Sequence, residues 1–162
     1  MYVDINIVRV MSRATPVPFE TTLRVRDCCL CLHVQRAARA LARRFDEALR
    51  PIGLTNGQFS LMMSLNRPEP AGLASVATLL AMDRTTLTAA LKPLQRRGLI
   101  TVAKDPSDRR GRRLSLTPAG KTLLASAMPV WEHTHREVEA SLKDADKDAD
   151  PDRLRNSLLA LS

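Results

Sequence analysis

The sequence predicts a mainly helical protein of the α+β class. From Asp27 onward, apolar residues recur mostly at steps of three and four, a spacing that places them on one face of a helix. The exception lies between Gly98 and Thr117, where two short apolar runs flank an arginine-rich loop. Helix, strand, basic loop and strand in this order are typical of a winged helix-turn-helix with a small β-hairpin wing. We expect further helices on both sides of this unit.

The N-terminal part divides into an arm and a first long helix. Residues 1–26 are predicted to form an arm, either disordered or associated with a dimer, because Thr15–Glu20 contains two prolines that interrupt helices. From Asp27 the apolar positions follow a helical spacing, and a Pro-Ile-Gly sequence ends the pattern. We therefore assign residues 27–54 to an N-terminal dimerisation helix.

Capping residues locate the next helices. Thr55 and Gln58 have the spacing of a capping box, in which each side chain bonds the backbone N–H of the other. A short third helix is predicted over residues 74–81. Asp83 is a good N-cap for the fourth helix, because its carboxylate can accept the free N–H groups of the first turn.

The helix that begins after Asp83 has two different faces. Leu87, Leu91 and Leu94 recur at steps of four and three and are predicted to face the core. The other side carries groups that can donate hydrogen bonds to guanine or phosphate, or present methyl groups to thymine. We predict that it enters a major groove of double-stranded DNA through Arg84, Thr85, Thr86, Thr88, Ala89 and Lys92.

Positive charge is concentrated in the same part of the chain. Residues 84–113 hold nine Lys and Arg against two Asp, a net charge of +7, whereas the whole chain carries +8. Such clustering is expected of a protein that neutralises phosphates; the alternative is a solvated basic face. Its coincidence with the helix-turn-helix pattern favours DNA, so residues 55–117 are assigned to a winged helix-turn-helix DNA-binding domain.

Two further helices are expected in residues 118–162, which we assign to C-terminal dimerisation. The first starts at a proline, which suits the first helical position because its missing N–H costs nothing there. This helix should be interrupted or kinked at Pro129. An acidic linker, Asp144–Asp152, precedes a last amphipathic helix over Arg153–Leu161. These helices exceed what a DNA-reading unit needs, so their apolar stripes predict a helical dimer interface.

The wing carries a specific family motif. Its sequence, Asp-Arg-Arg-Gly-Arg-Arg-Leu-Ser-Leu-Thr over Asp108–Thr117, fits the pattern of Asp, one residue, Arg and then Leu-Thr that marks the MarR family of winged-helix transcriptional regulators. The apolar and glycine positions of Leu91–Ile100 support the match. From about Asp27 to its last residue the chain resembles this family.

The resemblance implies a transcriptional regulator that binds DNA as a homodimer. Residues from both chain ends would intertwine, and two recognition helices would read a pseudo-palindromic operator. In the wing it implies that Asp108 braces Arg110 and that Arg109, Arg110 or Arg112 makes the contact at the tip. The function we predict is a homodimeric repressor released by a small-molecule effector. The binding site of this effector could be lined by Phe59, Met62, Met63 and Trp131. Because such spacing is also typical of a core, no ligand site is assigned.

Three cysteines, Cys28, Cys29 and Cys31, cluster at the expected start of the first helix. A helix N-terminus can lower a thiol pKa, and Cys28 and Cys31 are three residues apart on one helical face. The alternatives are redox-active thiols and small apolar residues buried at a dimer interface, of which we prefer burial. A metal site is not expected, because a second cysteine pair is lacking.

The family resemblance sharpens the redox alternative. Cys31 falls about where the organic-hydroperoxide sensors of the family have their reactive cysteine. However, Phe45 and Asn56 stand where those sensors have tyrosines, and neither carries a phenol hydroxyl. Thiol-based sensing through Cys31 and its neighbours is therefore the alternative function.

Neither catalysis nor a bound cofactor is predicted. The chain lacks a phosphate-cradling glycine loop, and no βαβ pattern precedes Cys28 as a thioredoxin-type enzyme would need, so a thiol enzyme is a minor alternative. No apolar run has transmembrane length, and Met1–Val10 alternates polar with apolar residues instead of forming a signal core. We expect a cytoplasmic protein whose partners are DNA, a second copy of the chain and a small effector, with no membrane.

Overall fold

The computed structural model describes residues 16–106, 108 and 111–161. Contacts divide the chain into two compact units, one that ends at Ala40 and one that begins at Leu41. In the described part of the chain, no helix combines the length and the apolar character needed to cross a membrane.

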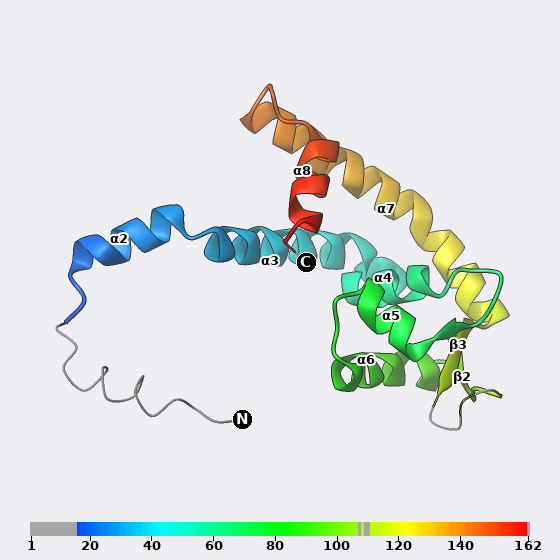
Figure 1. The fold of residues 1–162 in the computed structure, drawn as a ribbon. Helices are drawn as coiled ribbons and strands as arrows, with labels where there is room; N and C mark the ends of the chain where they lie inside the picture. Colours follow the sequence, from blue (N-terminus) through cyan, green and yellow to red (C-terminus); the bar gives the residue numbers. More distant parts are fainter. Residues whose placement is uncertain (1–15, 107, 109–110, 162) are drawn as a thin grey trace, which may run out of the picture. The chain divides into compact units, whose positions relative to one another are not determined.

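The N-terminal unit consists of helix α2 (Phe19–Cys28) and the first half of helix α3 (Leu30–Leu49) (Figure 1). Residues 19–26, expected to belong to an arm, are helical, whereas residues 1–15 lie outside the described residues. Pro18 precedes α2 as its N-cap, a position where a proline removes no intrahelical hydrogen bond.

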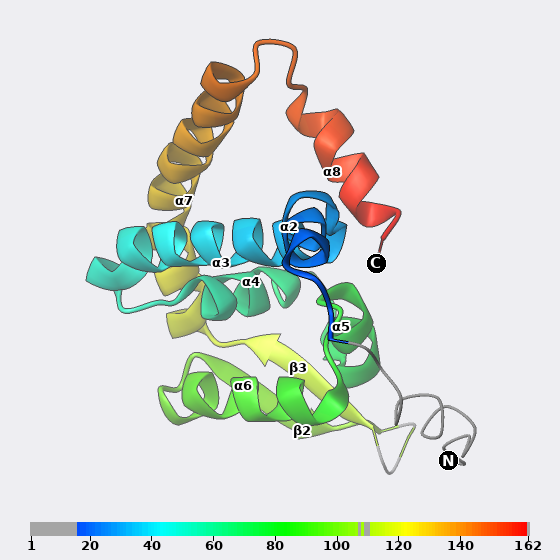
Figure 2. The same cartoon turned by 90° about the vertical axis from the view of Figure 1, so that its left-hand side faces the viewer.

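The second unit contains the predicted helix-turn-helix and wing in the expected order. After α3 the elements are the 3₁₀ turn η1 (Arg50–Ile52), α4 (Asn56–Ser64), β1 (Ala71–Gly72), α5 (Leu73–Leu79), α6 (Arg84–Arg96), β2 (Ile100–Lys104), β3 (Arg112–Leu116), α7 (Pro118–Ala145) and α8 (Pro151–Leu159). Helices α4, α5 and α6 and the β2–β3 hairpin lie together, and Figure 2 shows α7 extending away from them.

The predicted helix caps are confirmed. Thr55 Oγ1 accepts a hydrogen bond from the Gln58 N–H at 3.2 Å, and Gln58 Oε1 accepts one from the Thr55 N–H at 3.2 Å, which completes the capping box of α4. Asp83 Oδ1 accepts from the Thr86 N–H at 2.8 Å and caps α6. These bonds satisfy donors that a helix start would otherwise leave unpaired.

The wing belongs to a three-stranded antiparallel sheet with the order β1-β3-β2. In the hairpin, Ile100 pairs with Leu116 and Lys104 pairs with Arg112. Strand β1 was not predicted: its two residues, Ala71 and Gly72, pair with Leu114 and Arg113. A two-residue strand is too short to show the alternation that marks strands in a sequence.

The core lies among α4, α5, α6 and the sheet. The leucines predicted to face inward from α6 are all buried: Leu87, Leu91 and Leu94 are 0%, 4% and 0% exposed. They belong to one cluster with residues of α3, α4, α5, β3 and α7, including Leu49, Leu61, Met62, Val76, Leu114 and Leu124.

The C-terminal helices differ from the prediction in two details. Helix α7 continues through Pro129, so the predicted interruption is absent, since one missing backbone hydrogen bond is outweighed where neighbouring residues such as Leu124 and Ala127 are buried. The alternative, a kink at Pro129, stays a prediction. The linker is correspondingly shorter, and α8 begins at Pro151, where Asp150 Oδ1 accepts the N–H groups of the first turn.

Candidate DNA-binding surface

Helix α6 presents the predicted groove-facing residues to solvent. Arg84, Thr85, Thr86, Thr88, Ala89 and Lys92 are all exposed. Every one of them except Thr86 lines a single shallow hollow of about 330 Å³ along the helix. The leucine face of α6 is buried in the core, and therefore its orientation is fixed by packing. The structure thus gathers two cations, two hydroxyls and a methyl group along one exposed stripe.

The threonine hydroxyls of α6 differ in what they can still bond. Thr86 Oγ1 donates to Asp83 Oδ2 at 2.6 Å, and Thr88 Oγ1 donates to the Arg84 carbonyl at 2.7 Å. Phosphate oxygens only accept hydrogen bonds, so a hydroxyl whose hydrogen is committed cannot serve them. Thr85 has no such side-chain bond within the described part of the chain and keeps its hydrogen for a phosphate or a base.

The start of α6 is also electrostatically defined. The hydrogen bond from the Thr86 hydroxyl, followed by the bond from the Thr86 N–H, holds the pKa of Asp83 below its ordinary value. The carboxylate is therefore ionised at neutral pH and fixes the first turn of the helix. Arg84, the first residue of the helix, is placed by this cap.

A salt bridge that the sequence did not reveal holds the base of the wing. Arg113 Nε lies 2.7 Å from Asp105 Oδ2, whose side chain is only 11% exposed, and Arg113 Nη1 donates to the Pro70 carbonyl at 3.3 Å. Arg113 therefore joins the end of β2 to the residue before β1. Its charge was part of the basic cluster in the sequence, but its contacts are intramolecular.

The remaining wing predictions divide into described and undescribed residues. Arg112 lies half-buried on β3, and its Nη1 donates to the Gly111 carbonyl at 2.9 Å. Asp108 is exposed, and its carbonyl accepts the Gly111 N–H at 2.9 Å. Arg109 and Arg110 lie outside the described residues. The brace between Asp108 and Arg110, and the identity of the wing-tip arginine, accordingly stay predictions.

Another arginine of the basic cluster also has an intramolecular role. Arg97 Nη1 donates to the Gly53 carbonyl at 2.8 Å. This bond joins the end of α6 to the turn before α4. Gly53 in that turn has a φ of 75°, in the left-handed region that favours glycine. Charge counting could not separate such arginines from those that face solvent.

Comparisons with known proteins place these features in one family. The sequence profile of the MarR family matches residues 54–111. A crystal structure of the Mycobacterium tuberculosis transcriptional regulator MosR in complex with DNA is 36% identical, with a TM-score of 0.73, and covers 82% of this chain and 92% of that one. The chain belongs to the MarR family. It is a transcriptional regulator of MarR type that binds DNA.

Two further MarR-like relatives are informative. The transcriptional repressor CouR of Rhodococcus jostii, bound to a 23-mer DNA duplex, is 26% identical, with a TM-score of 0.65, and covers 91% of this chain and 96% of that one. The organic hydroperoxide resistance transcriptional regulator of Bacillus subtilis is 27% identical over 101 residues, which are 62% of this chain and 69% of the relative.

The cysteine cluster of this MarR protein is not arranged as expected. Cys28 ends α2, Cys29 is extended with φ −75° and ψ 104°, and Cys31 lies in α3. Cys28 and Cys31 therefore do not share the face of one helix. Both are exposed, Cys29 is half-buried, and all three are free thiols. The interpretation preferred from the sequence was burial at a dimer interface; since Cys28 and Cys31 are exposed within the chain, only a partner could bury them, and this stays a prediction.

The surroundings of the cysteines carry paired charges. Arg26 Nε bonds Asp27 Oδ1 at 2.6 Å, which lowers the pKa of Asp27 and raises that of Arg26. This salt bridge balances the positive charge of Arg26 close to the thiols. In the part of the chain that the structure describes, no three His, Cys, Asp or Glu side chains lie close enough together to hold a metal ion.

Proposed function

We propose that this MarR regulator reads a pseudo-palindromic operator with the exposed stripe of α6. The supporting observation is that Arg84, Thr85, Thr88, Ala89 and Lys92 line one hollow on a helix whose opposite face is buried. Arg84, Lys92 and the hydroxyl of Thr85 can donate there to base edges or phosphates, and the methyl groups can contact thymine. The wing arginines Arg109, Arg110 and Arg112 would add contacts beside this groove.

Substitution of the two cations tests this surface. We expect Arg84→Ala and Lys92→Ala each to weaken operator binding by about 1–3 kcal/mol if the side chain contacts a base, and to relax specificity at one position. A phosphate contact would instead weaken all sequences alike and reduce the salt slope by about one. Arg136→Ala and Lys143→Ala, exposed residues of α7, are matched controls. Unchanged salt-titrated binding of both α6 variants would show that another surface reads the DNA.

The operator itself is to be found by selecting bound duplexes from a random pool. Enrichment of two similar half-sites in inverted orientation is expected, because two copies of α6 in a twofold-symmetric dimer read inverted sequences. Enrichment of a single half-site would argue for a monomeric reader.

We further propose that the chain is a homodimer built by its terminal helices, residues 27–54 and 118–162. Helix α8 buries no residue and exposes Leu154 and Leu158, four residues apart, at 45% and 41%; Leu161, two residues beyond the end of the helix, is 62% exposed. Helix α3 exposes Leu30, Val34 and Leu41 in a similar way. Stripes of this kind require a partner to leave water.

The dimer is tested by introducing charge into the α8 stripe. Leu154→Glu combined with Leu158→Glu should convert a dimer into a monomer in sedimentation analysis, while a Ser157→Glu control on the same helix should not. A wild-type chain that sediments as a monomer at micromolar concentration would contradict the proposal.

We propose that the regulator is a repressor and that a small ligand releases it from DNA. CouR, which is similar over nearly its whole length, is a transcriptional repressor. In vitro transcription from a promoter that overlaps the selected operator should be inhibited by the protein. Stimulated transcription would identify an activator instead.

A thiol switch is the second candidate. Its support is the exposure of Cys28 and Cys31 and the similarity to the Bacillus subtilis regulator of organic hydroperoxide resistance. Peroxide would oxidise an exposed thiolate more readily than a buried thiol. If the candidate is right, cumene hydroperoxide should abolish operator binding by the wild type and spare Cys31→Ser. Full binding by a protein whose Cys31 is oxidised, as seen by mass spectrometry, would exclude it.

A further inference from the structure

Helix α6 contains a proline in its interior. Pro93 lies within the helix, which continues through it to Arg96. Because proline has no backbone N–H, the carbonyl of Ala89, four residues earlier, cannot accept the hydrogen bond that is usual in an α-helix. No side chain in the described part of the chain donates to this carbonyl. Proline is the least favourable residue in a helix interior, so Pro93 leaves this acceptor without its helical partner at a cost in stability.

The residue that carries this carbonyl lies in the exposed stripe of α6. Ala89 is exposed and lines two neighbouring hollows. One is the hollow of about 330 Å³ described above; the other, of about 440 Å³, is lined by Ala89, Lys92, Pro93, Gln95 and Arg96. Alanine has the smallest side chain of the stripe, so a base edge can approach the backbone most closely at this position.

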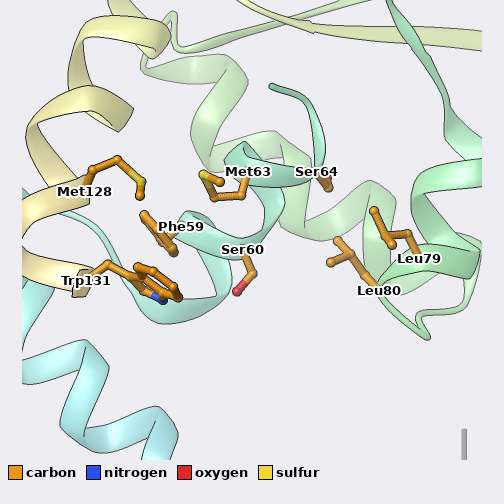
Figure 3. A pocket seen from close by; sticks show the side chains of 8 residues that line it. All are labelled: Phe59, Ser60, Met63, Ser64, Leu79, Leu80, Met128 and Trp131. Atoms are coloured by element: carbon orange, nitrogen blue, oxygen red, sulfur yellow. The ribbon is translucent and has the colours of Figure 1, made fainter. Parts of the chain in front are cut away.

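The hollows on α6 differ in chemistry from an apolar pocket of the same unit. This pocket, of about 380 Å³, opens between α4, the end of α5 and α7, and Figure 3 shows the eight uncharged side chains that line it. Of the residues considered from the sequence, Phe59, Met63 and Trp131 line it, whereas Met62 is buried in the core. Both hollows on α6 are lined by cations instead, which suits a polyanion such as DNA.

A carbonyl oxygen in this stripe can bond only certain parts of DNA. Carbonyl and phosphate oxygens both only accept hydrogen bonds, so the Ala89 carbonyl has no partner on the DNA backbone. In the major groove the donors are the amino groups of adenine (N6) and cytosine (N4). Arg84 and Lys92 only donate, and therefore they favour the acceptors of guanine and thymine. The carbonyl thus adds a preference that these two cations cannot supply.

From these observations we infer that the Ala89 carbonyl, freed by Pro93, accepts a hydrogen bond from a base amino group, and that Pro93 is a specificity-determining residue. The inference rests on the proposed function, in which the stripe of α6 enters the major groove. One position of each half-site should accept adenine or cytosine on the contacted strand. Thymine and guanine should be rejected there, because their keto oxygens would face the carbonyl oxygen.

The first test restores the missing donor. Pro93→Ala supplies a backbone N–H for the Ala89 carbonyl and should raise the melting temperature, because alanine suits a helix interior. In selection from a random pool, the variant should lose the adenine-or-cytosine preference at one position and keep the others. Its affinity for the wild-type operator should fall about three- to tenfold, the range of one neutral hydrogen bond. The salt slope should not change, because no cation is lost.

Pro129→Ala is the matched control, since Pro129 lies inside α7 and outside the α6 hollows. It should leave every base preference as in the wild type. An unchanged preference in Pro93→Ala would overturn the inference. Weaker preferences at all positions alike would show that the whole helix has moved, and would overturn it as well.

The second test removes the amino group from the DNA. At the position found by selection, adenine is replaced by purine, or cytosine by 2-pyrimidinone, each of which lacks the amino group. The wild type should bind this duplex about three- to tenfold more weakly, and Pro93→Ala should bind both duplexes equally, so that the two changes are not additive. Equal losses in both proteins would overturn the inference. If Arg84→Ala and Lys92→Ala weaken binding but this coupling is absent, the inference fails alone; if those two variants bind normally, the proposed surface fails with it.

Discussion

The winged-helix unit and the terminal helices have similar sequence patterns but different environments. In α6, leucines at steps of three and four are buried, with Leu87 and Leu94 at 0% exposure. In α2 and α8 the described residues include none that is buried. A stripe of apolar residues therefore specifies a helix face, and only surrounding elements turn that face into a core. The stripes of the terminal helices are left for a partner.

The largest expected effect lies in the core of the winged-helix unit. Leu94→Ala should lower the free energy of unfolding by about 2–5 kcal/mol, because it removes a fully buried side chain and leaves a cavity. Leu158→Ala, on exposed α8, should change it by less than about 0.5 kcal/mol at concentrations where the chain is monomeric. Urea denaturation measures both.

The same pair of variants can sharpen the comparison. If α8 lies in a dimer interface, Leu158→Ala should become destabilising as the protein concentration rises, while the loss in Leu94→Ala should stay constant. A loss of several kcal/mol in monomeric Leu158→Ala would contradict the difference between the two regions.

Close backbone packing gives the next effect. A Cβ at Gly120 would lie 2.0 Å from the Leu99 carbonyl oxygen, where α7 meets the strand that follows α6. Gly120→Ala should therefore destabilise the protein by about 1–3 kcal/mol or more. Gly57→Ala is the control: its Cβ meets no atom within 4 Å, and alanine in a helix should be slightly stabilising. Thermal unfolding that ranks Gly120→Ala as the more stable variant would contradict this packing.

Within the winged-helix unit, the wing depends on polar contacts. Arg113→Lys keeps the charge but cannot reproduce both the Asp105 pair and the bond to the Pro70 carbonyl. We expect less than about 1 kcal/mol of destabilisation, because the side chain is 42% exposed. Operator affinity should nevertheless fall, with an unchanged salt slope, since the wing is displaced and no cation is lost. A reduced salt slope would instead make Arg113 itself a phosphate contact.

Local signals in the sequence predicted what local chemistry determines. The Thr55 and Gln58 capping box and the Asp83 cap depend on residues three apart, and both were located correctly. The leucine face of α6 and the order of helices and strands followed from spacing. The exposed stripe of α6 was predicted because it lies on the side of the helix opposite those leucines.

Features that depend on residues distant in the chain could not be predicted. The Arg113 contacts with Asp105 and Pro70 need the sheet to be formed first, as does strand β1. The break between α2 and α3 at Cys29 could not be predicted, because no proline or glycine lies near it in the sequence. The pocket combines α4, α5 and α7, and each of its residues alone has the spacing of a core position.

The smallest expected effect concerns how α8 is held. Arg155 Nη1 donates to Glu139 Oε1 of α7 at 2.9 Å, and Arg155 also pairs with Asp152 in its own helix. The bond from Arg155 lowers the pKa of Glu139 and the carboxylates raise that of Arg155. A carboxyl group with a lowered pKa in the folded state stabilises the fold above its unfolded pKa, about 4.3 for glutamate, and this stabilisation disappears as the pH falls through the lowered value.

Helix α8 should consequently loosen in acid before the winged-helix unit does. The rate of amide hydrogen exchange of residues 151–159, corrected for the intrinsic rates, should rise as the pH falls from about 5 to about 3, a range around the ordinary glutamate pKa. The amides of α6 should stay protected over this range. Glu139→Gln supplies the comparison: it should exchange faster than the wild type at pH 5 and equally fast at pH 3. Added salt should reduce the difference at pH 5, because the pair is exposed and screened. Equal exchange by both proteins at pH 5 in low salt would mean that apolar contacts, not the Arg155 pair, hold α8.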